Sequence, residues 1–294
     1  MMSARDAYKA ELTELAEADP RIVCLEADLG GAKHGFQERI PDRFLNLGIA
    51  EASAVDIAVG LASAGLRPFL STFATFAMFR AAESVKLGLG YLGAPVVLVC
   101  PYGGVSGAWF GPTHHCLEDL AVAQSLPGLR IAVPAGEAET REVIRTAAAG
   151  DRPCYVRLAR NDVFDVPLVP AARGTVSWLN PITEGTCLVS IGEKPTELCA
   201  AATEQRPELG HAHLCWVDAE SLAEVVPQLA GARRLVVVEE HRGAGSVAAT
   251  LALMLPGRDV RGVNAGTDWP TEGGSHDETL AALGLTVSAV LQAA

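Results

Sequence analysis

Residues 44–63 read FLNLGIAEASAVDIAVGLAS, and this stretch decides how the rest of the chain is interpreted. Its apolar start, residues 44–47, predicts a short buried strand that turns through Gly48 into a helix of small residues over 52–63. Glu51 stands at the start of that helix, where exposed N–H groups and the helix dipole favour negative charge. The same position follows the carboxyl end of a strand, where open α/β sheets place their ligands. A glutamate that simply opens a helix is the commoner case. Whether Glu51 has a functional role therefore depends on the surrounding sequence.

Short apolar runs alternate with helical stretches along the first half of the chain. Strands are expected at 22–26, 44–47, 68–72, 96–100, 130–133 and 155–158. Helices are expected at 5–18, 52–63, 79–89, 117–125 and 137–149. Alternation of this kind predicts the α/β fold class, with mainly parallel sheets and helices on both faces of each sheet.

A polar stretch with prolines, residues 163–174, interrupts this pattern and is typical of a linker. The chain of 294 residues is long enough for about two domains. We therefore expect one domain at 1–165 and a second at 176–294, joined by a linker at 166–175. In the second domain, strands are expected at 186–191, 212–217, 235–239 and 260–263, and helices near 196–205, 222–229, 246–255 and 277–283.

The composition argues against several classes of function. The net charge of −12 disfavours nucleic acid and anionic membrane surfaces as partners, which leaves small molecules as the expected ligands. No apolar run of 18 or more residues occurs, and the polar, amphipathic N-terminus is unlike a signal peptide. The seven cysteines form no C-x-x-C pair and lie mostly in apolar runs, as expected for reduced residues of a cytoplasmic protein.

Three phenylalanines, Phe73, Phe76 and Phe79, follow one of the expected strands at a spacing of three residues. On a helix this spacing places the rings on one face. Such a stripe can simply fill a core, or it can form a flat apolar slot that grips an aromatic ring with Glu51 at its rim. A carboxyl group at that rim can share a proton with a ring nitrogen, which is what a cofactor with a protonatable heterocycle needs.

A glycine–proline loop at 111–113 precedes two adjacent histidines, His114 and His115. Histidine is the side chain best suited to proton transfer near neutral pH, although a histidine in such a loop is often an exposed bystander. Adjacent side chains cannot both point into one cleft, so at most one of the two is expected to act. With Glu118 nearby, a metal site is another interpretation of these histidines. The spacing is not a recognised zinc pattern, however, and we assign no metal ligands to this chain.

Charged residues also follow two later strands. Arg157 and Arg160 can clamp a carboxylate or a phosphate, or they can form surface pairs with Asp162 or Asp165. For residues 239–241 (EEH) a structural role is favoured. The sequence has no G-x-x-x-x-G-K-[ST], no G-x-S-x-G and no G-x-G-x-x-G between an expected strand and helix, so it shows no phosphate cradle of its own.

Taken in order, these pieces resemble the C-terminal half of a transketolase-type, thiamine-diphosphate-dependent enzyme, in which a pyrimidine-binding domain precedes the transketolase C-terminal domain. The likeness spans nearly the whole chain, so it is more specific than any single motif. The matching stretches are 27–29 (ADL), 41–44 (PDRF), 48–51 (GIAE), 60–62 (GLA), 68–73 (PFLSTF), 111–114 (GPTH), 117–120 (LEDL), 133–135 (VPA), 155–160 (YVRLAR) and 239–241 (EEH).

The resemblance implies which residues contact the cofactor. Glu51 would hydrogen-bond its aminopyrimidine ring and so activate the thiazolium ring, which then serves as the electron sink. This makes Glu51 a catalytic residue by general acid–base chemistry. The residues implied to bind the cofactor are Asp28, Leu29, Glu51, Phe73, Phe76 and Phe79, with the three rings lining the slot and Asp28 and Leu29 near the reactive centre.

The resemblance also implies the substrate contacts. His114 would be the second catalytic residue, because it would touch the substrate and help to stabilise or protonate the intermediate. Arg160 would face the distal anionic group of the donor, and Phe110 would line the same site. The implied reaction is transfer of a two-carbon ketol or acyl unit to an acceptor.

Enzymes of this type hold the cofactor's diphosphate and its Mg²⁺ in another domain, through a Gly-Asp-Gly motif that this sequence lacks. The resemblance therefore implies one subunit of a split enzyme. Its partner would be a separate N-terminal-half subunit that binds the diphosphate and supplies most of the Mg²⁺ contacts. Thiamine diphosphate would be shared at the interface between the two subunits. An α2β2 heterotetramer is the expected assembly, since oligomers tend to close with two-fold symmetry.

Some positions depart from the family pattern. An acidic residue usually precedes Gly-Pro-Thr-His, and here Trp109 and Phe110 stand there. Ala32 and Tyr102 replace a serine and a histidine that the pattern leads one to expect at the donor-phosphate site. Because two large apolar residues cannot bond donor hydroxyls as a carboxylate does, we expect a substrate other than the ordinary pentose phosphates.

Other interpretations stay open. The chain could be the β-type subunit of a 2-oxo acid dehydrogenase or decarboxylase, or resemble a deoxyxylulose-phosphate synthase. It could also be a regulatory or scaffolding subunit with no catalysis, although retention of both Glu51 and His114 speaks against that.

Overall fold

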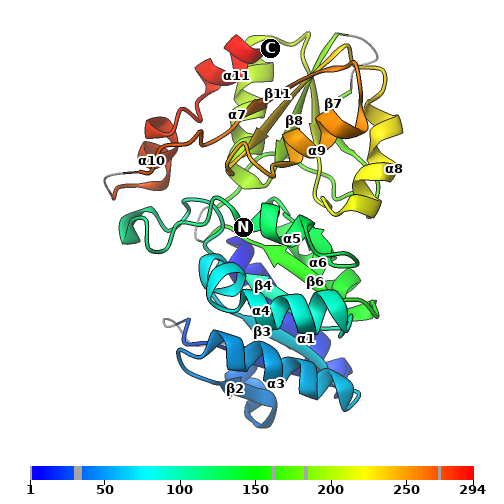
Figure 1. The fold of residues 1–294 in the computed structure, drawn as a ribbon, viewed down its shortest axis with the longest axis vertical. Helices are drawn as coiled ribbons and strands as arrows, with labels where there is room; N and C mark the ends of the chain where they lie inside the picture. Colours follow the sequence, from blue (N-terminus) through cyan, green and yellow to red (C-terminus); the bar gives the residue numbers. More distant parts are fainter. Residues whose placement is uncertain (1, 30–34, 161–162, 182–184, 271–272) are drawn as a thin grey trace.

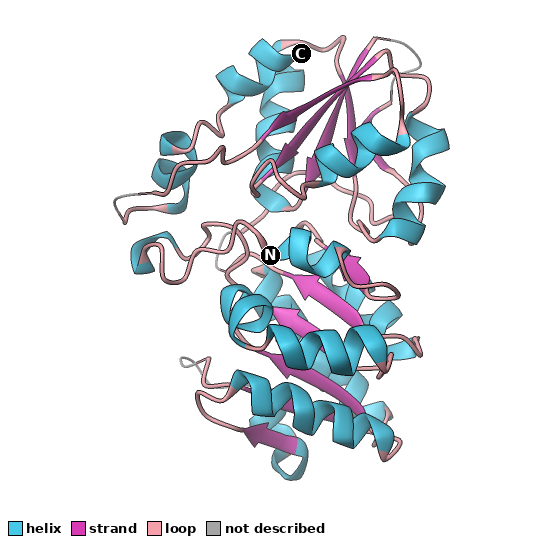
Figure 2. Ribbon diagram, in the orientation of Figure 1, coloured by secondary structure: helices cyan, strands magenta, loops and turns pink. Residues whose placement is uncertain are grey.

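The computed structural model describes residues 2–29, 35–160, 163–181, 185–270 and 273–294, and these form two sheets, one from each half of the chain (Figures 1 and 2). Strands of the first sheet are all parallel, in the order β2-β1-β3-β4-β6-β5. Their carboxyl ends therefore share one edge of the sheet. The bounds are β1 Ile22–Glu26, β2 Phe44–Asn46, β3 Arg67–Ser71, β4 Val97–Cys100, β5 Arg130–Ala132 and β6 Cys154–Arg157.

Helices bury both faces of this sheet, as near-continuous apolar parallel strands require. One face packs against α1 (Ala4–Ala18) and α6 (Gly136–Ala149). The other face packs against α3 (Glu51–Ser63), the π-helices η2 (Phe76–Arg80) and η3 (Lys86–Tyr91), and the helices α4 (Ala82–Val85) and α5 (Asp119–Gln124). Short helices complete this half: α2 Gly35–Arg39, η1 Pro41–Arg43 and η4 Ala108–Phe110.

The second sheet has the order β11-β10-β8-β9-β7, and β7 alone among its described strands runs antiparallel. Its strands are β7 Ser177–Asn180, β8 Thr186–Ile191, β9 Gly210–His213, β10 Arg234–Glu239 and β11 Asp259–Val263. Apolar contacts place α7, α10 and α11 on one face and α8 and α9 on the other. The bounds are α7 Glu193–Gln205, α8 Ala219–Leu229, α9 Val247–Met254, α10 His276–Ala282 and α11 Val287–Ala293. The α/β prediction with two mainly parallel sheets is confirmed.

The two halves are bonded to each other, which explains one difference from the expected strands. A strand is expected at 212–217, but β9 ends at His213. The next residues leave the sheet and pair with the first half instead. Val133 donates its N–H to the carbonyl of Cys215 at 2.7 Å, and Val217 donates to Ile131 at 2.9 Å.

Two further expectations are wrong in detail. The strand β2 is not buried, because it lies at the edge of the sheet, and Leu45 on it is 38% exposed. The single helix expected at 79–89 is instead two π-helices, η2 and η3, that flank the short helix α4. In a π-helix each N–H bonds the carbonyl five residues back, as Ala81 does to Phe76 at 3.1 Å.

Besides the 3₁₀ helices η1 and η4, three regular elements were not expected from the sequence: α2, β7 and α11. They are short, of five, four and seven residues respectively. Among the described residues, no helix combines the length and the apolar character that crossing a bilayer requires.

Candidate active site

The site lies along the carboxyl edge of the first sheet, beginning with Glu51. This residue opens α3 just after β2, and its side chain is 3% exposed. Arg80, the last residue of η2, donates from Nη1 to Glu51 Oε1 at 2.7 Å. The same guanidinium lies 4.0 Å from the centroid of the Phe76 ring. A buried carboxylate is costly unless it is paired, so Arg80 compensates Glu51 and ties it to the aromatic series.

His114 is packed among three phenylalanine rings from other parts of the edge. Its ring centroid lies 5.3 Å from that of Phe73 and 5.2 Å from that of Phe76, both edge-on. Phe110 stacks on it at 4.4 Å with an interplanar angle of 20°. Burial, and then the nearby positive charge of Arg80, lower the pKa of His114 below its usual value. The imidazole is therefore neutral near pH 7 and able to accept a proton at one nitrogen.

A second aromatic group continues from this one toward β6. Tyr102, after β4, is 2% exposed and packs against Phe73 with ring centroids 4.4 Å apart and the rings tilted by 50°. The Arg160 guanidinium lies 4.4 Å from the centroid of the Trp109 ring and 4.9 Å from that of Tyr102. Cations over aromatic faces are attracted by the ring quadrupole, and burial lowers the pKa of Arg160. The structure thus brings Phe73, Phe76, Phe110, His114 and Arg160 together.

Phe79 does not join this group. It is 53% exposed, and within the described part of the chain its ring contacts none of the other rings. The expectation of three rings on one face is wrong here, because the i, i+3 rule belongs to the α-helix and η2 is a π-helix.

Asp28 and Leu29 lie at the same sheet edge, just after β1. Asp28 is exposed and Leu29 is half-buried. Asp28 has φ +46°, a left-handed conformation that non-glycine residues seldom adopt and that often marks a functional site. The departure noted at Ala32 and the alternative partner Asp162 both lie outside the described residues.

His115 and Arg157 turn into the interior. His115 is 3% exposed, and its Nε2 lies 3.4 Å from the carbonyl oxygen of Ala108. Arg157 is 5% exposed and donates from Nε to Asp119 Oδ2 at 2.7 Å. Arg157 therefore has a structural role, in contrast to Arg160 at the open edge. Within the described residues, no group of three or more His, Cys, Asp or Glu side chains is placed to hold a metal ion.

Sequence analysis missed two parts of this arrangement. Arg80 was not considered, because nothing in its local sequence indicates that it reaches Glu51 across 29 residues. Tyr102 was noted only as a departure, although its positive φ of 64° and its contact with Phe73 place it at the centre of the rings. Gly107 is the local signal of this packing, because a Cβ there would lie 2.5 Å from Cδ1 of the Tyr102 ring.

The family model described as "Transketolase, pyrimidine binding domain" matches residues 1–164. The chain is 30% identical over 259 residues to one subunit of the apulose-4-phosphate transketolase of Phocaeicola vulgatus, covering 85% of this chain and 82% of that protein. It is 31% identical over 300 residues to 1-deoxy-D-xylulose-5-phosphate synthase of Nitratidesulfovibrio vulgaris, covering 97% of this chain and 46% of the synthase. The chain thus spans about half the length of that relative.

Two solved structures show the same fold. A protein described as "Split gene transketolase, inactive beta4 tetramer" superposes with a TM-score of 0.87 at 28% identity, covering 100% of this chain and 97% of that one. A transketolase from Campylobacter jejuni superposes with a TM-score of 0.82 over 99% of this chain, but over 46% of its own length. At 18% identity this second likeness concerns the fold alone.

Proposed function

The chain belongs to the transketolase family, and from that premise we propose that it is the pyrimidine-binding subunit of a split, thiamine-diphosphate-dependent transferase. The reaction proposed is the transfer of a two-carbon ketol or acyl unit. The observation that carries the proposal is the Glu51 carboxylate, 3% exposed at the carboxyl edge of a parallel sheet and next to the ring group of His114.

The side chains at this edge have the chemical properties that an aminopyrimidine ring requires of its binding site. Such a ring has flat apolar faces and nitrogen atoms at its rim. Phe73 and Phe76 supply apolar surface, their centroids 5.4 Å apart, and Glu51 supplies an acceptor for a ring N–H. Phe79 could take part only if the cofactor or a partner covers its exposed ring. Asp28 and Leu29 are proposed to lie near the reactive centre, because they follow the neighbouring strand β1.

When bound, thiamine diphosphate would supply a carbon nucleophile that also acts as an electron sink. Glu51 would hold a proton at the pyrimidine ring nitrogen, and Arg80 compensates the Glu51 charge and orients the carboxylate while no ring is present. His114, neutral near pH 7, would exchange a proton with the oxygen of the reacting carbonyl. Arg160 would bind an anionic group on the donor, with the aromatic surfaces of Trp109 and Tyr102 holding its guanidinium plane.

The missing half of the site is proposed to come from a second chain. The sequence contains no Gly-Asp-Gly motif for the diphosphate and its Mg²⁺, and the described residues hold no metal cluster of their own. Large apolar side chains are exposed on β2, α3, η2 and η3 and in the turns beside them, as is typical of an interaction surface. They are Leu45, Ile49, Ile57, Phe79, Leu87, Tyr91 and Leu92. We propose an α2β2 heterotetramer with an N-terminal-half subunit.

The domain boundaries and the location are part of the same proposal. The first sheet ends at Arg157 and the second begins at Ser177, which supports domains at 1–165 and 176–294 with a linker at 166–175. All seven cysteines are buried and free, which supports a reducing, cytoplasmic location.

The donor is proposed to differ from the ordinary pentose phosphates. Phe110 and Trp109, 43% and 47% exposed, face the site with no side-chain acceptor for a donor hydroxyl. Kinetics of the reconstituted pair with xylulose 5-phosphate test this proposal. Efficient turnover of that ketose would overturn it, whereas strong preference for a less hydroxylated donor is the expected result.

Calorimetry with thiamine diphosphate and Mg²⁺ tests the central proposal. We expect tight, Mg²⁺-dependent binding only when this chain is mixed with the diphosphate-binding subunit, and weak binding to this chain alone. Binding in the mixture that is unchanged by Glu51→Gln, with full activity retained, would overturn the assignment of Glu51.

The identity of the donor that is turned over also distinguishes the proposed activity from the related ones. Turnover of a 2-oxo acid with release of carbon dioxide and transfer to a lipoyl group would indicate a dehydrogenase β-type subunit. Condensation of pyruvate with an aldehyde phosphate would indicate a synthase-like activity, which the likeness to the N. vulgaris synthase supports. Cofactor binding without any turnover would favour a regulatory or scaffolding subunit.

A further inference from the structure

One loop carries most of the residues that face the proposed substrate. It runs from β4 to α5, residues 101–118, and holds Trp109, Phe110 and His114. Its regular structure is limited to the 3₁₀ turn η4 and one bridge, in which Gly104 and Cys116 exchange backbone hydrogen bonds of 2.9 and 2.8 Å. A loop closed only at its base needs outside contacts to hold a fixed shape.

Most of those contacts come from the C-terminal half. Glu240, at the end of β10 and 6% exposed, accepts a hydrogen bond from the Val105 N–H at Oε1, 2.9 Å away. The same oxygen lies 2.6 Å from His276 Nε2, at the start of α10. A Cβ on Gly104, which has φ +62°, would lie 2.7 Å from this oxygen. The base of the loop is therefore shaped around the Glu240 carboxylate.

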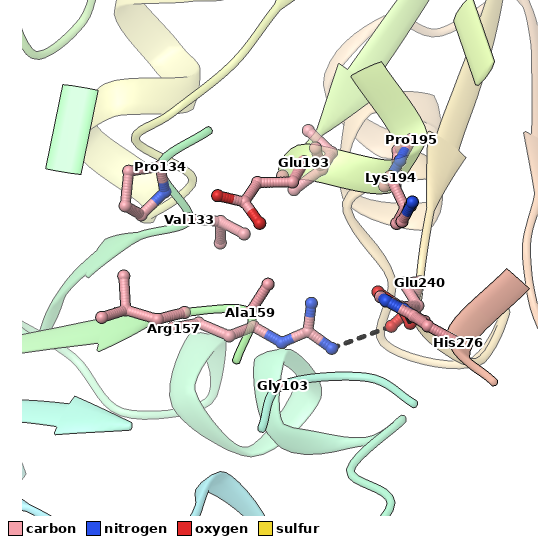
Figure 3. A pocket seen from close by; sticks show the side chains of 13 residues that line it. Gly103, Val133, Pro134, Arg157, Ala159, Glu193, Lys194, Pro195, Glu240 and His276 are labelled. Carbon is pink, nitrogen blue, oxygen red and sulfur yellow. Dashed lines mark hydrogen bonds and ion pairs between the residues drawn. The ribbon is translucent and has the colours of Figure 1, made fainter. Parts of the chain in front are cut away.

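The other end of the loop is held by Arg157, on β6 of the first half, and by Arg242, two residues after Glu240. Arg157 donates from Nη2 both to the Cys116 carbonyl at 3.1 Å and to the Glu240 carbonyl at 2.8 Å. Arg242 donates its N–H to the Leu117 carbonyl at 2.7 Å. Figure 3 shows Arg157, Glu240 and His276 around a cavity of about 20 Å³, enough for roughly one water molecule. The end of β10 thus contacts both ends of the loop.

Electrostatics favours an ionised Glu240 in this place. Burial alone would raise the pKa of its carboxyl group, but His276 and Arg157 hold that pKa below its usual value. Charge-assisted hydrogen bonds such as Val105 N–H to this carboxylate are stronger than neutral ones. Near the tip, Gly273 approaches the carbonyl oxygens of Ala108 and Trp109, where a Cβ would lie 3.4 and 3.5 Å away.

We propose that Glu240, supported by His276, is a positioning residue that fixes the 101–118 loop and thereby the placement of His114 and Phe110. The inference rests on the proposed function for its catalytic consequence only. The C-terminal half would then act on the reaction without touching substrate or cofactor. Misplacing a catalytic group by about 1 Å can cost on the order of 100-fold in rate, so this support would matter even though it lies outside the site.

The chain offers a matched control in the adjacent residue. Glu239 is also fully buried, and it accepts hydrogen bonds from the N–H groups of Val247 and Ala248 at 2.9 and 3.0 Å. It therefore supports α9 and not the loop. Glu239→Ala and Glu240→Ala both remove a buried carboxylate that accepts backbone N–H groups, and Glu240→Gln restores an acceptor for Val105.

The first measurement is amide hydrogen exchange in the isolated chain, which needs neither cofactor nor partner. We expect Glu240→Ala to speed exchange at the amides of Gly104, Val105 and Cys116 by at least about tenfold. Glu240→Gln should restore most of the protection. Glu239→Ala should instead affect α9 and leave the loop unchanged. Equal exchange in the loop for the 239 and 240 variants would overturn the proposal.

The second measurement is steady-state kinetics of the enzyme reconstituted with its partner. Glu240→Ala should lower kcat by about 10- to 100-fold while the Kd for thiamine diphosphate stays near that of the unsubstituted enzyme, and Glu239→Ala should keep kcat. A loosened loop with unchanged kcat would overturn the catalytic role and leave the family assignment intact. Absence of turnover in the unsubstituted pair would count against the proposed function, and the exchange result would still decide the support of the loop.

Discussion

At the scale of single residues, the pairing of Glu51 with Arg80 defines what the site can do. Glu51 is 3% exposed, whereas the Arg80 side chain is 48% exposed, so the carboxylate is enclosed and its partner reaches the surface. A ring nitrogen that approached Glu51 could replace Arg80 as the hydrogen-bond donor without leaving the carboxylate unpaired. Arg80 would then remain in place through its contact with the Phe76 ring, 4.0 Å from the centroid.

This arrangement predicts that Glu51→Gln abolishes catalysis without unfolding the chain. The amide keeps the size of the side chain but cannot hold the proton, so kcat should fall by about 100-fold or more. Steady-state kinetics of the reconstituted enzyme, with the far-ultraviolet circular dichroism of this chain, provides the measurement. Glu83→Gln, on the exposed surface of α4, is the matched control and should keep full activity. Equal activity in the two variants would contradict the role of Glu51.

Phe110 predicts a change in donor preference. A carboxylate at this position could accept hydrogen bonds from donor hydroxyls, which the phenyl ring cannot do. Phe110→Asp should therefore raise the ratio of kcat/KM for a hydroxylated ketose to kcat/KM for pyruvate by roughly tenfold. Phe110→Leu controls for the lost stacking on His114, 4.4 Å between centroids, and should leave the ratio unchanged. If both variants shift the ratio alike, Phe110 does not set the preference.

The residues that the sequence singles out for the candidate site differ from those it does not in how far their partners lie along the chain. Glu51 and His114 stand in local patterns, a strand-to-helix turn and a Gly-Pro loop, that can be interpreted from a few neighbours. Arg80 and Tyr102 act through contacts between separate segments, to Glu51 and Phe73 respectively. Such contacts depend on the order of strands in the sheet, which the chain order alone does not determine.

At the scale of elements, regular periodicity was predictable and irregular geometry was not. The strands β1 and β8 were placed at their observed bounds, because buried parallel strands are short apolar runs between turn residues. The π-helices η2 and η3 could not be predicted in this way. Their sequences are apolar and have the period of an ordinary helix, and the hydrogen-bond register changes only through packing. Gly88 in η3 is one place where this packing is close: a Cβ there would lie 2.5 Å from Val59 Cγ2, so α3 leaves no room for a side chain.

The loop between β4 and α5 predicts an unequal effect of two alanine substitutions. Gly104 and Gly257 both have positive φ, +62° and +82°, but only Gly104 faces a neighbour, the Glu240 carboxylate. Both changes carry backbone strain of about 1–2 kcal/mol. Gly104→Ala should lower the free energy of unfolding by a further 1–3 kcal/mol, roughly, through overpacking. Urea denaturation of the isolated chain measures the difference, and equal destabilisation would show that the loop can move away from Glu240.

At the scale of the whole molecule, the two halves pack against each other and are not joined by the linker alone. A single apolar cluster includes Leu98 of β4, Leu120 of α5 and Leu222 of α8, so it extends across the junction. Polar contacts cross it as well, since His213 Nε2 lies 2.9 Å from Glu139 Oε2, with both side chains nearly inaccessible. The sequence indicated two α/β units and a linker between them. It could not indicate this junction, because the residues that form it look like ordinary strand ends and helix starts.

A buried histidine of the second sheet also predicts how stability depends on pH. His211 on β9 is 1% exposed, and its Nε2 lies 2.9 Å from Ser190 Oγ. Burial, with a smaller contribution from His213, lowers the pKa of His211 from 6.5 to about 3. Between these two values the unfolded chain binds a proton that the folded chain does not, so stability rises with pH in this window. The contribution is complete above about pH 6.5 and is lost progressively as the pH falls.

At pH 5 this single histidine should cost about 2 kcal/mol of unfolding free energy relative to pH 7.5. Urea denaturation of the isolated chain at the two pH values measures the total change, and His211→Gln isolates the part that belongs to this residue. Glutamine carries no titrating group and can still form a hydrogen bond with Ser190 Oγ, so the variant should lose less stability than the unsubstituted chain between pH 7.5 and 5. The same pH dependence in both proteins would show that His211 gains its proton in the folded state, which requires the second sheet to open to water around β9.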